Sequence, residues 1–367
     1  MRPTSESGTG TLSCREDWPE AAERMARWWK GDYLGRPAMH VTAPRSGAVW
    51  CELAPAPDLW QHWTNPDYVV PRTEQTVCNT AWFGEACPQS WVNLGPVSQA
   101  GYLGTGLHAM PQTIWQSPIV DDWEAYEPQF DPANEWWQIT RRLTQAMLEA
   151  AQGRWFVANA DLAEATDVMS YLRGPERLCI DLLEARPATL RRVRDQLIDL
   201  LIFFYDDLTK LVAPYQQGTS SWLGVWSPGR TSTLQCDFSC MISKPLFDEF
   251  VLPGLVALSR HLDHIIYHLD GPGAIHHVDS LLQIPRLHAI QWVPGSGDES
   301  AAHPKWRPLL RRIIDAGVRV HLSVSPSDVE SLLRDLPADG LFLSVTCASE
   351  DNARELLKKA EQWSWTR

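Results

Sequence analysis

The sequence predicts an α/β protein folded as a (β/α)8 barrel of the TIM type, with a Trp-rich, loop-rich N-terminal extension. From Glu135 onward, short apolar strands alternate with helical patterns, which is typical of parallel strand pairing. The length of 367 residues suits one large barrel with an extension. An open, doubly wound sheet is the competing fold, but no G-x-G-x-x-G or P-loop follows the strands. We therefore expect residues 135–367 to form the barrel and residues 1–134 to pack on it or cap it.

The first part of the chain is rich in tryptophan, proline and glycine and lacks long periodic runs. Thirteen of the 19 tryptophans occur at or before Trp155. Large indole side chains can hold a loop-rich layer together by filling the gaps between loops and a barrel wall. One early helix is expected over residues 18–29, with Asp17 as its N-cap and Glu20 completing a capping box.

The second part of the chain provides most of the predicted strands and helices. Helices are expected where apolar residues recur at three- and four-residue spacing, and strands where short apolar runs end at glycine or proline. Six strands are clear from the sequence. A short extended segment at residues 234–238 and a strand in the tryptophan-rich first part can add two more, which gives the eight strands of a barrel. In chain order, we expect helix 135–151, strand 155–160, helices 175–183 and 187–211, strand 222–226, an extended piece at 234–238, a helix from Ser243, helix 255–262, strand 264–270, helix 274–282, strand 288–293, helix 306–316, strand 318–324, helix 326–336, strand 341–346 and helix 350–363.

Composition limits the classes of partner. The formal net charge of −13 argues against nucleic acid and against an anionic membrane surface, because both require a basic footprint. The chain has no run of about 18 apolar residues, the length that spans a bilayer. Residues 1–13 lack the apolar region of a secretory signal, so we expect a cytoplasmic protein. The eight cysteines include no C-x-x-C pair, and most are expected to be reduced, buried thiols.

The strand expected over residues 264–270 carries the clearest chemical pattern. His268 and Asp270 are two residues apart, so they point to the same face where the strand enters the loop Gly271-Pro272-Gly273. An imidazole beside a carboxylate makes half of a metal site, or an acid/base pair. A buried histidine satisfied by a neighbouring aspartate is the alternative.

The other strand ends add further candidate residues. The carboxyl ends of barrel strands meet at one mouth, where the chemistry of such barrels takes place. Neither a nucleophile elbow nor a hydrolytic triad order is present. Imidazole, thiolate and carboxylate together are typical of a zinc site. The residues at these ends are Trp226, Cys236, Asp237, His268, Asp270, Gln291, Trp292 and Cys347.

Several sequence blocks resemble a known family. The more specific ones are Gln235-Cys-Asp-Phe238, Tyr267-His-Leu-Asp-Gly-Pro272 and Ile290-Gln-Trp-Val-Pro-Gly295. The chain resembles the uroporphyrinogen decarboxylase-like superfamily over most of its length. Within that superfamily it resembles the corrinoid-associated methyltransferase branch, labelled trimethylamine corrinoid protein 2-like. Further matching blocks are Trp28-Trp29, Arg36-Pro37, Gly84-Glu-Ala86, Trp91-Val-Asn-Leu-Gly-Pro96 and Arg173-Gly174.

The resemblance implies a zinc-dependent methyltransferase. Zinc enzymes of this superfamily carry an H-x-C motif at one strand end and a further cysteine near the last strand. His268 matches the histidine, Cys347 fits the distal cysteine by placement, and Asp270 stands where the first cysteine would be. The implied metal ligands are therefore His268, Asp270 and Cys347, and the carboxylate makes the site harder than the family pattern.

The implied reaction moves a methyl group between a corrinoid, or a small methylated substrate, and a thiol or related acceptor. Zinc would stabilise the acceptor thiolate, and three protein ligands would leave the fourth position open. The fingerprint D-x-H-x-x-G of corrinoid-binding modules is absent, so methylcobalamin would arrive free or on a separate corrinoid protein. The expected catalytic residues are Asp237 and His277, and the expected substrate-binding residues are Trp222, Trp226, Cys236, Gln291 and Trp292.

Two other functions compete with methyl transfer. A uroporphyrinogen decarboxylase-like lyase would need arginines clustered at the mouth to bind a polyacidic tetrapyrrole. Most arginines instead occur in helical stretches, such as Arg191-Arg192 and Arg311-Arg312. A metal-free barrel that binds a small ligand in an aromatic pocket is the second alternative, which the aspartate at position 270 leaves open. Tryptophans at the strand ends can pack the barrel or hold a methylammonium group.

Overall fold

The computed structural model describes residues 12–96, 98–159, 161, 163–184 and 187–366, and its largest sheet has seven strands. Neighbouring strands are parallel except for β2, which is antiparallel to β1. This confirms the predicted α/β class and its mainly parallel pairing, but the described residues form no closed sheet. In spatial order the strands are β2 (Thr80–Gly84), β1 (Ala38–Pro44), β13 (Leu341–Thr346), β12 (Arg319–Val324), β11 (Leu287–Val293), β10 (His264–Asp270) and β9 (Thr231–Gln235).

The two faces of this sheet differ in chemistry because successive side chains of a strand point to opposite faces. One face carries buried aliphatic side chains, among them Leu269, Ile290 and Leu343, which belong to the main apolar core. On the other face His268 lies opposite Gln291 in the pairing of β10 with β11. The first face needs a cover of helices. The other face is apolar at its amino end, where Ile266 and Phe342 are buried, and more polar toward the carboxyl ends of the strands.

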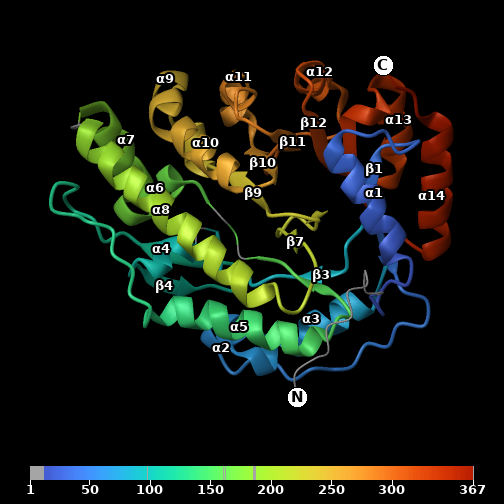
Figure 1. The fold of residues 1–367 in the computed structure, drawn as a ribbon, viewed down its shortest axis with the longest axis horizontal. Coiled ribbons are helices and arrows are strands. Elements are labelled where there is room, and N and C mark those ends of the chain that lie inside the picture. The colour runs from blue at the N-terminus through green and yellow to red at the C-terminus, as the bar shows by residue number, and fades with distance from the viewer. Residues whose placement is uncertain (1–11, 97, 160, 162, 185–186, 367) are drawn as a thin grey trace.

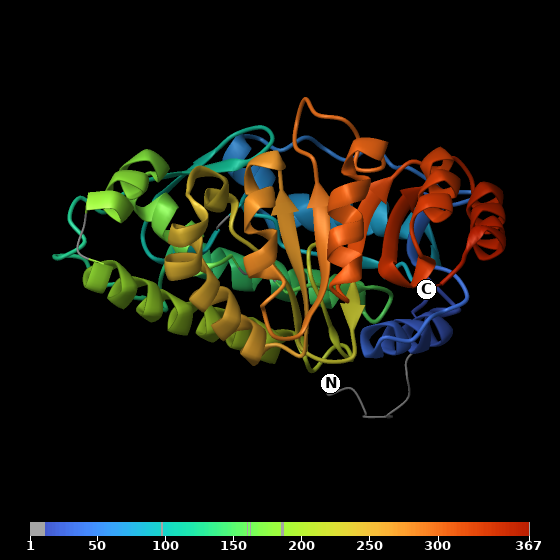
Figure 2. The same cartoon turned by 90° about the horizontal axis from the view of Figure 1, so that it is seen from above.

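Helices that follow the strands cover the first face of the sheet (Figure 2). In α12, for example, Leu310 and Ile313 are buried while Arg311 between them is exposed, as expected for a helix with one face on a sheet. The covering helices are α10 (Leu252–His261), α11 (Val278–Leu281), α12 (Arg307–Asp315), α13 (Val329–Asp335) and α14 (Glu350–Trp363).

The chain between β1 and β9 also builds a second layer. Part of it lies opposite the covering helices in Figure 1, while its helix of residues 187–212 packs beside α10. Its short strands pair in twos: β3 (Gln89–Ser90) with β6 (Phe156–Val157), β4 (Gly106–Ala109) with β5 (Ile114–Ser117), and β7 (Thr219–Ser220) with β8 (Trp226–Ser227). Its helices are α2 (Leu59–Thr64), α3 (Pro66–Cys78), α4 (Ser98–Tyr102), α5 (Glu135–Ala151), α6 (Ala165–Arg173), α7 (Pro175–Glu184) and α8 (Pro187–Val212).

Helix α1 (Trp18–Lys30) closes the amino end of the sheet with two tryptophans. The Trp28 ring meets Phe342 of β13 at 5.2 Å between centroids, and the Trp29 ring stacks on His264 of β10 at 4.7 Å. Trp29 Nε1 also donates a hydrogen bond to the carbonyl oxygen of Trp226. The helix was predicted, but its capping box is not formed: Asp17 is the N-cap without a side-chain cap, because its carboxylate pairs with Arg15 instead.

Some predicted elements differ from the structure. Residues 222–225 form a turn instead of a strand, because Gly224 has a φ of +79°, the left-handed region that glycine tolerates. The extended piece expected at 234–238 is split between the end of β9 and the 3₁₀ helix η1 (Asp237–Met241). The helix expected from Ser243 is built of α9 (Lys244–Leu246), the π-helical turn η2 (Phe247–Val251) and α10. In the part of the chain that the structure describes, no helix combines the length and apolar character needed to cross a membrane.

Candidate metal centre

Three possible metal ligands meet at the carboxyl ends of β9 and β10. His268 and Asp270 come from the end of β10, and Asp237 is the first residue of η1, which begins one residue after β9. One ligand atom from each of Asp237, His268 and Asp270 lies within 4.8 Å of the others. Since β9 and β10 are neighbouring parallel strands, their ends bring these groups to one edge of the sheet. His268 and Asp270 thus lie together, as their spacing predicts.

The imidazole of His268 is oriented by its strand partner. Its Nδ1–H donates to Oε1 of Gln291 at 2.6 Å, which leaves Nε2 with a lone pair for a ligand. The indole of Trp222 stands at the ring of His268 with 5.3 Å between centroids and an interplanar angle of 80°. Gln291 and Trp222, both predicted as site residues, are therefore placed next to the histidine.

Asp237 lacks a hydrogen-bond partner on one oxygen. Its Oδ1 is buried and accepts no hydrogen bond from the described residues. Burial and the negative charge of Asp270 raise the pKa of Asp237, while the nearby His268 opposes this effect. An unpartnered buried carboxylate oxygen beside an imidazole and a second carboxylate fits a divalent cation, since such an ion would replace the missing partner.

A third acidic side chain, Asp167, supports the backbone that carries Asp237. Asp167 of α6 is fully buried and accepts hydrogen bonds from the backbone N–H groups of Asp237 and Phe238, at 3.1 and 2.8 Å. Burial, followed by the charge of Asp237, raises the pKa of Asp167 to about 7. Asp167 therefore fixes the first turn of η1 and with it the position of Asp237.

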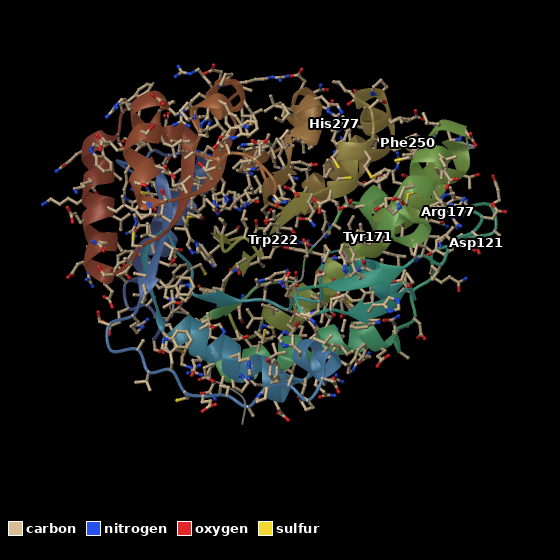
Figure 3. The ribbon with its side chains drawn as sticks, turned by 180° about the vertical axis from the view of Figure 1, so that it is seen from behind. Asp121, Tyr171, Arg177, Trp222, Phe250 and His277 are labelled. Carbon is tan, nitrogen blue, oxygen red and sulfur yellow. The ribbon has the colours of Figure 1, made fainter. Side chains whose placement is uncertain are left out.

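An apolar cavity adjoins the acidic group. Its volume is 280 Å³, and both Asp167 and Asp237 form part of its wall. No Arg or Lys is among the described residues that line it, which is unlike a pocket for a polyacidic ligand. Tyr171 and Trp222 both lie near the middle of the molecule in Figure 3. The remaining lining is mainly apolar or aromatic, including Trp115, Pro118, Tyr171, Phe238 and Met241.

Cys347 does not join the predicted ligand set. Among the described residues, the group of possible ligands holds Asp237, His268 and Asp270, without Cys347. Cys347 follows β13, which is separated from β10 by β11 and β12, and its backbone N–H donates to Thr42 O on the β1 side. Its thiol is buried, which raises the pKa of Cys347. The third ligand position predicted for Cys347 is filled here by Asp237.

The other predicted site residues lie away from the three ligands. Trp226 packs against Trp18 and Phe156 near the amino end of β9. Trp292 points to the opposite sheet face from Gln291 and packs on Trp306 at 4.8 Å. Both tryptophans therefore contribute to packing and do not line this site. Trp292 points to the other face of the sheet, and Trp226 lies at the opposite end of the strands.

Cys236 and His277 belong to the surroundings of η1. Cys236 is in the main core, and burial raises the pKa of its thiol well above the ordinary value. His277 is fully buried, stacks on Phe247 at 4.2 Å and donates from Nε2 to Ser239 O of η1 at 2.9 Å. Burial lowers the pKa of His277 to about 4, and its contact with Ser239 supports the backbone of η1.

Sequence reasoning missed two residues of this site. Asp167 belongs to a helix that was not predicted, so no strand end pointed to it. Cys240 is one of the eight cysteines and was given no site role. It lies one 3₁₀ turn after Asp237, and side chains three residues apart share a face of such a helix. Cys240 is exposed and packs against Gly273 in the loop that follows Asp270. The 3₁₀ spacing from Asp237 is the signal that could have indicated it.

Comparisons with known proteins add no family. No protein-family model matches the chain, and a comparison with curated proteins gives no match.

Proposed function

We propose that this protein is a zinc-dependent methyltransferase whose metal is held by Asp237, His268 and Asp270. The observation that carries the proposal is the meeting of these three side chains, together with the buried Oδ1 of Asp237, which has no hydrogen-bond partner among the described residues. Bound there, zinc would supply a positive charge that lowers the pKa of a substrate thiol in the open fourth position. The ligand set of one nitrogen and two oxygens is harder than the thiolate-rich set of the resembled family.

The residues around the ligands have separate roles in this proposal. Gln291 holds the tautomer of His268 that leaves Nε2 free, and Asp167 holds the turn that carries Asp237. In this proposal Trp222, beside the His268 ring, and the cavity wall around Tyr171 would shield the transferred methyl group from water. The methyl donor would be methylcobalamin, free or carried by a separate corrinoid protein.

The proposal includes a closed barrel as the frame of the site. We infer that β3 and β6 complete a cylinder of eight parallel strands with β1 and β9–β13. In support, Glu164 N–H donates to Gln235 O at 3.1 Å, and Asn159 N–H donates to Ser220 O at 3.2 Å. The hydroxyls of Ser221 and Thr233 lie 2.7 Å apart. These contacts connect the segment after β6 to β9 through the β7 region.

Metal analysis tests the ligand set. The purified full chain is expected to bind one zinc, and His268→Gln and Asp237→Asn are expected to lose it. Cys347→Ser is the matched control and should keep the metal, since Cys347 lies outside the group. Absence of zinc binding by the wild type, or full retention by His268→Gln, would refute the proposed centre.

Cobalt substitution tests the open position and the reaction. With ligands of nitrogen and oxygen only, the Co²⁺ form should show a thiolate-to-metal charge-transfer band only after a thiol is added. A band without added thiol that disappears in Cys240→Ser would mean that this neighbouring thiol is a ligand. Methyl transfer is followed by loss of the methylcobalamin spectrum with a panel of thiols. If the protein binds the metal but transfers no methyl group to any thiol of the panel, the methyltransferase activity is refuted and the metal centre remains supported.

Asp167→Asn is expected to weaken zinc binding by about 10–100-fold. The asparagine amide can accept one of the two backbone hydrogen bonds but presents an NH2 group to the other, so the first turn of η1 loses its support. Isothermal titration with zinc measures the change. Asp351→Asn, at an exposed carboxylate, is the matched control. Equal affinities in the two variants would show that Asp167 does not position Asp237.

A further inference from the structure

Two cysteines distant in the sequence lie in contact on the side of the molecule near α3. The Sγ atoms of Cys14 and Cys78 are 3.5 Å apart, and the residues are separated by 64 positions. Cys14 is in the segment before α1, and Cys78 is the last residue of α3. A disulfide bond of about 2.05 Å requires the sulfurs to approach by a further 1.5 Å or so. Side-chain rotation with a small backbone shift can provide that approach.

Both backbone polar groups of Cys14 are held by hydrogen bonds. Its N–H donates to Arg154 O at 3.4 Å, and its carbonyl oxygen accepts from the guanidinium of Arg45 at 2.6 Å. These contacts hold Cys14 against the end of α3. The folded structure therefore keeps the two thiols in contact.

The two thiols differ in reactivity. Cys14 is buried, with 7% of its surface exposed, and burial together with the hydrogen bond to Cys78 raises its pKa to about 12. Cys78 is half-buried and therefore more accessible to solvent than Cys14, and Nη1 of Arg154 lies 3.9 Å from its sulfur. Cys78 is therefore the thiol that meets an oxidant first, and Cys14 is the one placed to resolve the product.

We propose that Cys14 and Cys78 form a reversible disulfide when the protein meets hydrogen peroxide. The Cys78 thiolate attacks one peroxide oxygen, the O–O bond breaks, and the leaving hydroxide takes a proton to become water. The sulfur of Cys14 then attacks the sulfenic acid of Cys78, the S–O bond breaks, and a second water leaves with the thiol proton. In total, two thiols are oxidised to a disulfide and one peroxide is reduced to two waters.

The disulfide would connect the start of the described chain to the second layer. Arg15, next to Cys14, donates to the carbonyl oxygens of Ala86 and Gly84, so this segment already contacts the loop after β2. A covalent link across 64 positions restricts the unfolded chain and raises the melting temperature of the oxidised form, by roughly 5 °C. The inference is independent of the metal centre, because it rests on other residues.

Peptide mapping of the peroxide-treated full chain tests the proposal. The wild type is expected to lose two mass units, to yield a peptide pair joined through Cys14 and Cys78, and to recover both thiols with dithiothreitol. Cys14→Ser should trap a sulfenic acid at Cys78 that dimedone labels, and Cys78→Ser should show no dimedone label at Cys14. Cys51→Ser, at an exposed thiol outside the pair, is the matched control and should form the same link.

Three results would overturn the proposal. They are a wild type without the 14–78 link, a link formed mainly through other cysteines, and dimedone labelling of Cys14 in Cys78→Ser. The mapping of the wild type decides the matter even if a serine variant fails to fold. The rise in melting temperature should be absent from both Cys14→Ser and Cys78→Ser.

Discussion

Replacing Glu85 with glutamine is expected to lower the free energy of unfolding by about 3–5 kcal/mol. The carboxylate of Glu85 has no exposed surface and accepts hydrogen bonds from Arg24, Arg36 and the backbone N–H of Met39. Burial alone would raise the pKa of Glu85, but Arg36 and the hydrogen bonds lower it, so the group is charged. Glutamine keeps the shape but leaves the buried Arg36 without its counter-charge.

Urea unfolding followed by tryptophan fluorescence measures this effect. Glu355→Gln is the matched control, because Glu355 forms an exposed pair with Lys359 within one helix and should change the free energy of unfolding far less than Glu85→Gln does. A loss below 1 kcal/mol in Glu85→Gln would mean that the ion pair does not connect α1, β1 and the loop after β2 as its contacts indicate. Arg36 and Glu85 both lie in blocks that carry the family resemblance, and the structure gives them a structural role.

The regular elements of the second half could be predicted because their patterns are local. Helices α5 and α14 have the predicted bounds, since their apolar spacing and end signals agree. Strand β10 is likewise found over residues 264–270. The prediction failed at residues 222–225, where an apolar run resembles a strand but Gly224 adopts a left-handed turn against His40.

The site was partly predictable for the same reason. The spacing of His268 and Asp270 is a local signal, and Asp237 follows a strand end, so the sequence could place all three at one rim. Cys347 depends on the order of strands in the sheet, which sequence distance does not reveal. The orientation of Trp292 could have been predicted, because it directly follows Gln291 and must point to the other face.

The stability of the metal-free protein is expected to be greatest near pH 6.5. The acid side of this profile comes from buried histidines whose pKa is lowered by burial. Their pKa falls to about 4 for His40, His277 and His288 and to about 3 for His321, from an ordinary value of 6.5. Below pH 6.5 the unfolded chain binds protons that the folded chain refuses. Each such histidine therefore lowers stability by up to ~1.4 kcal/mol per pH unit as the pH falls.

The alkaline side comes from buried carboxyl groups with the opposite shift. Burial raises the pKa of Glu164 to about 8, and Asp167 acts in the same direction with a pKa of about 7. Above their ordinary pKa values the unfolded chain releases protons that the folded chain keeps, so these groups lower stability as the pH rises toward 8. Between about pH 4.5 and 6.5 the four histidines outnumber the two acids, and above pH 6.5 only the acids act.

Urea unfolding in EDTA at pH 5, 6.5 and 8 measures this profile. His321→Gln should reduce the loss between pH 6.5 and 5, and Glu164→Gln should reduce the loss between pH 6.5 and 8. His321→Gln should leave the alkaline side of the profile nearly unchanged. Glu164→Gln should also increase the loss of stability between pH 6.5 and 5, because Glu164 opposes the histidines in that range. A stability that continues to rise up to pH 8 would mean that Glu164 and Asp167 are ionised in the folded protein. In that case the acidic group beside Asp237 would carry its full negative charge without a cation, which the burial of these side chains opposes.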